Sequence, residues 1–409
     1  MTVSDTTSAP GDNNTTVEFF LLIVQALFFG IFGILLFNIH TGALPYNPDA
    51  TYGLLIVILA LQAISLGKTP LGDFRQSKIV TTIGFIAVIF GLIGCFVPGV
   101  SSTLLRYIVG VMLAGGGLAL LVETWLLNDR SRMWWRGGGV TRHLAVACSV
   151  TYLLMAVLGA ITLFPALAID ALTATLSILA ALAMLYLVWS LWRVSRTYPM
   201  QWARRRARYL GASTEKSESG LDLSSALLAT LAILLTLLGI LLLLVGRGIL
   251  PFSPDGQYGV LLTIMALQIG CLGVTPIGTF RRTPLITALA IVFVGIGIFS
   301  AISPGGITEP SRIILGLMNT AAGVTLLIGQ FSAKNIELRH PAPSPVAPQL
   351  RRLWLTQTLQ GVVGTVFGLS ALFPGMLSLT ITAVILVFYG LLLFYMCALL
   401  LKLAKLTPA

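Results

Sequence analysis

Residues 44–75 have the sequence LPYNPDATYGLLIVILALQAISLGKTPLGDFR, and residues 250–281 have the sequence LPFSPDGQYGVLLTIMALQIGCLGVTPIGTFR. Extended to the Pro-Gly pairs that close them, the stretches 44–99 and 250–305 align without a gap at an offset of 206, and 23 of their 56 positions are identical. Shared apolar composition does not account for matched prolines, aspartates, tyrosines, glutamines and arginines. The chain therefore contains an internal duplication, and we expect two copies of one structural unit.

The chain is far more apolar than a soluble protein. Hydrophobic residues make up 56% of its 409 residues and charged residues 10%, against the roughly 25% charged that soluble domains carry. Its long apolar runs are separated by short polar segments, and a helix of about 20 apolar residues crosses the hydrocarbon core of a bilayer. The composition predicts an all-α polytopic membrane protein, because a helix satisfies its own backbone within lipid.

Twelve apolar runs are candidates for transmembrane helices. They lie near 18–38, 51–67, 79–97, 104–127, 143–164 and 171–192, and then near 225–245, 257–273, 285–302, 313–332, 353–372 and 378–401. Six helices per copy bring both copies into the membrane from the same side, which predicts two parallel six-helix repeats. The expected domains are a disordered polar N-terminus at 1–17, a first membrane repeat at 18–192, a basic linker at 193–224, a second membrane repeat at 225–402 and a C-terminal tail at 403–409.

The basic residues predict the orientation, because cytoplasmic loops retain Lys and Arg. With the N-terminus inside, 22 of the 25 Lys and Arg residues fall on the cytoplasmic side, and Arg106, Arg247 and Arg312 fall outside. Both termini are then cytoplasmic, and the short loops favour a bacterial inner membrane. The basic linker is expected to contact anionic lipid headgroups, either as an interfacial helix or as a positive-inside anchor. A membrane-protein partner is left open, and the net charge of +11 needs no nucleic acid.

No motif in the sequence indicates catalysis or a cofactor. The four cysteines lie in apolar runs without paired spacing and the three histidines lie in separate loops, so no metal site is expected. Neither a Walker loop nor a GxSxG or HExxH motif occurs. No ionisable residue lies near the middle of a predicted span, which disfavours proton or ion coupling. We therefore expect neither an enzyme nor a cofactor.

Two glutamines are the deepest matched polar side chains. Gln62 and Gln268 occupy the second predicted span of each copy. A glutamine at membrane depth must face protein or a water-filled cavity. The pair is therefore a candidate polar pathway near the pseudo-twofold axis, and the alternative is a pair of interhelical hydrogen bonds.

Charged residues are also matched on the predicted outer face. Arg106 and Arg312 are 206 residues apart, as are Asp49 and Asp255. The planar fork of an arginine suits an anionic group, which makes the four residues a candidate anion site. Alternatively, each arginine forms a salt bridge with the aspartate of its own copy, or extends toward lipid headgroups.

A third matched feature is the loop motif G-x-T-P-x-G-x-F-R on the predicted inner face. Its residues are Gly67, Thr69, Pro70, Gly72 and Arg75 in the first copy, and Gly273, Thr275, Pro276, Gly278 and Arg281 in the second. Thr-Pro flanked by glycines predicts a tight, rigid turn.

The predicted spans pair into hairpins whose outer turns contain proline. Examples are Pro98-Gly99, Pro304-Gly305 and Phe373-Pro374-Gly375, and the last follows a helix with glycines at 361, 364 and 368. This pattern resembles the HdeD-like family of six-span membrane proteins, which is associated with acid resistance. The resemblance covers each half and is best at 357–396; it implies a stress-related role and no catalytic residues.

Two functions lead after these exclusions, and a lipid-modifying enzyme comes last because no acid-base pair is visible in the sequence. Two parallel six-span halves favour a transporter or permease for a neutral, lipid-like or weakly anionic solute. The hairpins and the lack of buried charge favour a non-transporting protein with a structural, complex-accessory or envelope-stress role. A polar cavity that reaches Gln62 and Gln268 would distinguish the first from the second.

Overall fold

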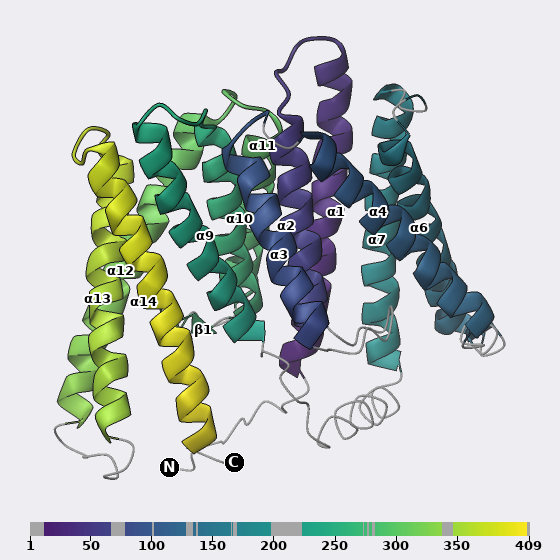
Figure 1. Ribbon diagram of the computed structural model, residues 1–409. Helices are drawn as coiled ribbons and strands as arrows, with labels where there is room; N and C mark the ends of the chain where they lie inside the picture. The colour runs from purple at the N-terminus through teal and green to yellow at the C-terminus, as the bar shows by residue number, and fades with distance from the viewer. Residues whose placement is uncertain are drawn as a thin grey trace. The chain divides into compact units, whose positions relative to one another are not determined.

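The computed structural model describes residues 12–66, 78–99, 102–127, 134–135, 138–164, 166, 170–197, 223–272, 274–275, 278–279, 283–337 and 347–406. Most of these residues are helical (Figure 1). The helices of the first half are α1 (Asp12–His40), α2 (Pro48–Leu66), α3 (Lys78–Phe96), α4 (Ser102–Val122), the π-helix η1 (Glu123–Leu127), α6 (Gly139–Leu163) and α7 (Asp170–Thr197). Those of the second half are α9 (Leu223–Gly246), α10 (Pro254–Leu272), α11 (Pro284–Ile302), α12 (Thr308–Glu337), α13 (Ala347–Leu372) and α14 (Leu379–Leu406).

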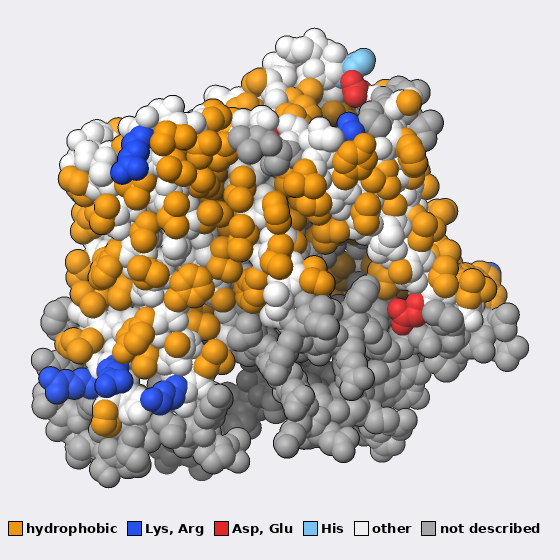
Figure 2. Space-filling model, viewed as in Figure 1, with side chains coloured by type: hydrophobic (Ala, Val, Ile, Leu, Met, Phe, Trp, Pro, Cys, Tyr) orange, Lys and Arg blue, Asp and Glu red, His pale blue; other side chains and the backbone are white. Residues whose placement is uncertain are grey.

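The helices have the length and composition of membrane spans. Within the described residues, eight of them are long and apolar enough to cross a bilayer: α1, α4, α6, α7, α9, α11, α12 and α14. Shorter apolar helical segments occupy Pro48–Ile64 and Thr81–Phe96. Hydrophobic side chains cover much of the described surface in Figure 2. The fold is therefore compatible with an integral membrane protein of helical class.

The contacts divide the chain into two compact units. The first unit contains α1, α6, α7 and α4 from Tyr107 onward, and the second contains α2, α3 and all the helices of the second half. This division differs from the boundary of the sequence repeat, because α2 and α3 belong to the first copy in sequence. The domains expected at 18–192 and 225–402 follow the duplication, whereas the compact units follow the contacts.

Close approaches at glycine join the helices into antiparallel pairs. In the first unit α1 pairs with α7, where a Cβ at Gly33 would lie 2.7 Å from the Ala174 carbonyl oxygen, and α4 pairs with α6 through Gly117. In the second unit α2 pairs with α3, α10 with α11, α12 with α13, and α9 with α14. Glycine suits these contacts because lipid supplies no hydrophobic force between helices, so that association depends on close backbone packing.

The same helix pairs form in both halves of the chain. Gly33 and Gly239 are 206 residues apart, and the carbonyls that they approach, Ala174 and Ala383, are 209 residues apart. The other equivalent approaches are Gly53–Gly91 with Gly259–Gly297, and Gly117–Tyr152 with Gly323–Gly361. In each half the first helix thus pairs with the sixth, the second with the third and the fourth with the fifth.

The hairpins α2–α3 and α10–α11 contact each other within the second unit. The Asn47 backbone N–H donates to the Ile302 carbonyl at 3.0 Å, and the Ser253 N–H donates to the Phe96 carbonyl at 3.0 Å. Asn47 Nδ2 also donates to Ser253 Oγ at 3.4 Å. Both donors and both acceptors are 206 residues apart, so the two hairpins exchange equivalent bonds about a local twofold axis. We call this contact the hairpin seam.

Proline and glycine end the helices where the sequence predicts turns. At the end of α3 the Val97 N–H donates to the Ile93 carbonyl, and at the end of α11 the Ser303 N–H donates to the Phe299 carbonyl, both at 2.9 Å. Proline at 98 and 304 cannot continue the helix, and Gly99 and Gly305 follow with φ of 85° and 83°. The predicted hairpin turns are therefore found at these positions.

Candidate functional site

The two matched aspartates lie at the start of α2 and α10 and are buried. Asp49 is 3% exposed and Asp255 is 8% exposed. Asp49 Oδ2 accepts from the Gly99 N–H, and Asp255 Oδ1 accepts from the Thr308 hydroxyl. Each carboxylate thus ties the start of its helix to the chain just beyond the next helix of the hairpin. Negative charge in the first turn also suits the helix dipole.

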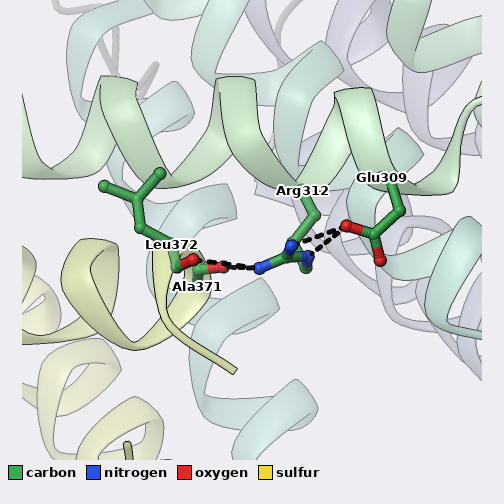
Figure 3. A network of polar contacts seen from close by, with 4 residues as sticks. All are labelled: Glu309, Arg312, Ala371 and Leu372. Carbon is green, nitrogen blue, oxygen red and sulfur yellow. Dashed lines mark hydrogen bonds and ion pairs between the residues drawn. The ribbon is translucent and has the colours of Figure 1, made fainter. Parts of the chain in front are cut away.

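Arg312 connects two helices of the second unit (Figure 3). Its Nη2 and Nε donate to Glu309 Oε2 at 2.6 Å and 3.1 Å. Its Nη1 donates to the carbonyls of Ala371 and Leu372, the latter at 3.3 Å. These are the last two residues of α13, whose carbonyls lack intrahelical partners and carry the negative end of the dipole. The guanidinium therefore caps α13 while Glu309 holds it in place.

The carboxylate that contacts Arg312 is Glu309. The sequence analysis considered an anion, Asp255 or lipid headgroups as its partner, and in the structure Asp255 bonds to Thr308 rather than to Arg312. The i,i+3 spacing of Glu309 and Arg312 on one helix is the signal that would have found this pair. Arg106, the matched residue of the first copy, is half-buried near the start of α4 and has an interaction partner.

The two candidate glutamines differ in their surroundings. Gln268 on α10 is 2% exposed, and within the described residues its Nε2 has no hydrogen-bond partner. Gln62 on α2 is half-buried and has an interaction partner. Leaving a buried amide N–H without a partner costs about 1–3 kcal/mol, so Gln268 is a position where an apolar side chain would remove a cost to stability.

Asn319 adds a second buried amide near the same helix. It lies on α12, where its Nδ2 donates to Leu315 O at 2.9 Å and to Met265 Sδ on α10 at 3.4 Å. Met265 precedes Gln268 by three residues, which places both on one face of α10. Sequence reasoning overlooked Asn319, although an asparagine within the apolar run 313–332 is itself a signal of an interhelical contact.

The loop motif is described in part. Its first copy, Gly67 to Arg75, lies outside the described residues, as do Gly273, Pro276 and Arg281 of the second copy. In the second copy β1 (Val274–Thr275) pairs antiparallel with β2 (Gly278–Thr279), and Thr275 lies opposite Gly278. The chain therefore reverses within a few residues between α10 and α11, at the place where the motif predicts a tight turn.

In the first unit one histidine is in an ion pair. His40 Nδ1 lies 2.9 Å from Asp170 Oδ2, and both side chains are more than half exposed. The contact joins the last residue of α1 to the first of α7. Within the described residues no group of three or more His, Cys, Asp or Glu side chains is placed to hold a metal ion.

The packing, the apolar helices and the buried polar residues define a helical protein compatible with integration into a membrane. No protein-family model, no curated protein and no solved structure matches the chain. The resemblance to the HdeD-like family therefore stays a prediction, and the function must be inferred from the residues themselves.

Proposed function

We propose that the protein is a twelve-span carrier, built as two parallel six-helix repeats, for a neutral, lipid-like or weakly anionic solute. The observation that carries this proposal is the hairpin seam, in which Asn47 and Ser253 exchange equivalent backbone hydrogen bonds with Ile302 and Phe96. An exchange between matched positions is what two parallel copies produce across a twofold axis. The repeated helix pairing supports the same arrangement over the full length of both halves.

The distribution of contacts suits alternating access. Close backbone packing holds each glycine-packed pair together as a rigid element. Among the described residues, two backbone hydrogen bonds cross the seam, at the Asn47 and Ser253 ends of α2 and α10, and each contributes only about 0.5–1.5 kcal/mol net. We infer that the seam opens and closes at this end while the pairs move as bodies. Gln62 and Gln268, further along α2 and α10, then supply polar groups to the solute.

A thiol-accessibility experiment tests this proposal. Cys95 is a free buried cysteine, and a side chain at Gly256 would overlap its carbonyl oxygen. We would replace the other three cysteines by serine and label Cys95 with a membrane-impermeant maleimide in sealed vesicles. We expect slow labelling in the parent protein and labelling at least several-fold faster in Gly256→Leu, because the leucine separates α10 from α3.

A control variant and a contradicting result complete the thiol-accessibility experiment. Gly329→Leu serves as the control, since that glycine is exposed on α12, the space around it is open and its φ is not positive. This control should not change the labelling rate. Labelling of Cys95 that stays absent from both sides of the membrane in Gly256→Leu, while the variant still folds, would contradict a seam that opens.

A non-transporting role is the second candidate, and one observation favours it. The six glycine-packed pairs among the described helices are in close backbone contact, which suits a rigid scaffold as well as it suits a carrier. In that case the protein would stabilise a membrane complex or protect the envelope under stress, as the HdeD-like resemblance implies. Co-purification of a stoichiometric membrane-protein partner, together with an inaccessible Cys95, would favour this function.

The proposed location is a bacterial inner membrane with both termini in the cytoplasm. Its support is the distribution of Lys and Arg along the sequence. Cysteines introduced at position 43, which is exposed in the loop between α1 and α2, and at position 214 test it in intact cells. We expect an impermeant thiol reagent to reach position 43 from outside and position 214 only after the membrane is opened.

A further inference from the structure

A cluster of aromatic and basic side chains lies where α6 begins and α7 ends. Tyr186 and Trp189 stack with ring centroids 5.7 Å apart and an interplanar angle of 18°. His143 lies edge-on to both rings, and its Nδ1 is 2.7 Å from the Tyr186 hydroxyl. The Arg193 guanidinium lies 5.1 Å from the centre of the Trp189 ring. Contacts between rings thus hold the two helix ends together.

Two further arginines of these helices also lie over tryptophan rings. Arg142 on α6 is 4.3 Å from the centre of the Trp135 ring, and Arg196 on α7 is 4.4 Å from that of Trp192. All three tryptophans are exposed, Trp189 being 39% exposed. A guanidinium that lies flat on an indole keeps its N–H edge free to bind an anion. We call Arg142, Arg193 and Arg196 with their tryptophans the Arg–Trp cluster.

The helices that carry the cluster offer it no acidic counterpart. Within the described parts of α6 and α7 the one acidic residue is Asp170, which lies at the other end of α7 and bonds to His40. The neighbouring π-helix η1 contributes Glu123, and its Trp125 Nε1 donates to Ser149 Oγ on α6. Three guanidiniums against this one carboxylate leave this end of the helix pair positively charged. Tryptophan and arginine together at a helix end are typical of the level of lipid headgroups.

Exposed apolar side chains continue from the cluster along both helices. On α6 they are Val146, Val150 and Leu153, at spacings of four and three residues, and on α7 they are Leu182 and Leu185. These spacings place the exposed side chains of each helix on one stripe. A ligand with a charged head and apolar tails fits such a surface over its whole length, whereas a free phosphate ion uses only the basic end.

We propose that the Arg–Trp cluster and the adjoining apolar stripe bind an anionic phospholipid. The guanidinium edges of Arg142 and Arg193 take the phosphate diester, for which their planar forks are suited. The rings of Trp189 and Tyr186 lie at the level of the glycerol backbone, and the acyl chains follow Val150, Leu153 and Leu182. This binding is independent of transport, because it uses residues of the first unit alone.

The second half of the chain provides a matched comparison. The contacts of α1 with α7 and of α4 with α6 match those of α9 with α14 and of α12 with α13 at an offset of 209 for α6 and α7. At this offset Arg142 corresponds to Arg351 and Arg193 to Lys402, so the positive charge is retained. Trp189 and Trp192 correspond to Ala398 and Leu401. The second half therefore has the charges without tryptophan at these two matched positions, and its Trp354 near the start of α13 donates to the Gln330 carbonyl at 3.3 Å. Non-specific attraction to an anionic surface should be similar at both places.

Fluorescence quenching with brominated lipids tests the proposal in the full-length protein. We would reconstitute it into nanodiscs of phosphatidylcholine with rising fractions of brominated phosphatidylglycerol, and compare brominated phosphatidylcholine. We expect brominated phosphatidylglycerol to quench tryptophan fluorescence at a several-fold lower lipid fraction than brominated phosphatidylcholine does. The preference for the anionic lipid should be lost in the triple variant Arg142→Gln, Arg193→Gln, Arg196→Gln. It should be mostly kept in the control variant Arg351→Gln, Arg352→Gln, Lys402→Gln, which removes as many charges.

Three outcomes would overturn the proposal. The first is equal quenching by the two lipids in the parent protein, and the second is an equal loss in both triple variants, which would mean attraction to the surface in general. The third is loss of the preference in millimolar inorganic phosphate, which would mean a phosphate site without a lipid. Arg193→Lys keeps the charge and removes the planar fork, so an intermediate preference in that variant would support the site even if a triple variant fails to fold.

Discussion

The backbone N–H of Asn47 donates to the carbonyl of Ile302 at 3.0 Å, across two hairpins that are far apart in sequence. Its counterpart, Ser253 to Phe96, has the same length and lies at an offset of 206 for both donor and acceptor. A single contact between distant segments has many explanations, but a reciprocal pair requires that the two hairpins be placed equivalently. The duplication in the sequence is therefore also a relationship in space.

The glycine contacts predict a sharp difference between neighbouring positions on α4. A Cβ at Gly117 would lie 2.7 Å from the Tyr152 carbonyl oxygen, whereas Gly116 has open space. We expect Gly117→Ala to lower the free energy of unfolding by about 1–3 kcal/mol through overpacking. Gly116→Ala should leave stability unchanged or raise it by up to about 1 kcal/mol, because alanine favours helix. Thermal unfolding in detergent measures both, and equal effects would contradict the α4–α6 pairing.

Arg312 should stabilise the protein by capping the C-terminal end of α13. We expect Arg312→Ala to destabilise the protein by about 1–3 kcal/mol, because the Ala371 and Leu372 carbonyls lose a charged donor. Glu309→Gln removes a partially exposed partner and should cost less, about 0–1 kcal/mol. Hydrogen exchange at the last turn of α13 would locate the effect. Unchanged exchange there in Arg312→Ala would mean that the cap contributes nothing.

Asp255 and Thr308 should be energetically coupled. The hydroxyl of Thr308 donates to the Asp255 carboxylate, and Asp255 is buried. We expect Asp255→Ala and Thr308→Val each to destabilise by about 1–3 kcal/mol, and the double variant to cost less than the sum. A double-mutant cycle from chemical denaturation measures the coupling. Additive effects would show that the two side chains do not act together in solution.

Gln268 and Gln62 should respond differently to leucine. Gln268→Leu removes an amide whose Nε2 is buried without a partner in the described structure, so we expect stability to be unchanged or to rise by about 1–2 kcal/mol. Gln62→Leu removes an amide that has a partner, and we expect no such gain. Differential scanning calorimetry compares the two. A loss of stability in Gln268→Leu would indicate that water or a solute satisfies the amide.

The helices themselves were largely predictable from the sequence. The expected span at 285–302 agrees closely with α11 at Pro284–Ile302, and that at 353–372 ends where α13 ends, at Leu372. The boundaries depend on local chemistry: Thr283 caps α11 through a 3.2 Å bond from the Ile286 N–H, and proline with glycine stops it. The span expected at 104–127 proved less regular, because α4 ends at Val122 and continues as the π-helix η1.

The interaction partners of the candidate site residues were harder to predict from the sequence. Arg312 was considered with Asp255 because both are matched at the repeat offset, yet its carboxylate partner is Glu309, whose counterpart in the first copy is Thr103. Asn319 was overlooked because the first copy has Leu113 at that position. Reasoning from matched residues finds what both copies share, and it passes over what one copy has alone.

The sequence by itself determined the duplication, the helical class and the positions of the turns, since these follow from residue identity, apolar length and the backbone chemistry of proline and glycine. Only the tertiary structure decided which helices pair, because a glycine in an apolar helix does not specify the backbone it will approach. It also decided that Asn47 bonds to Ile302, and that the last two helices of each half correspond at 209 rather than 206. Those relationships depend on the rotation of each helix about its axis, which packing alone determines.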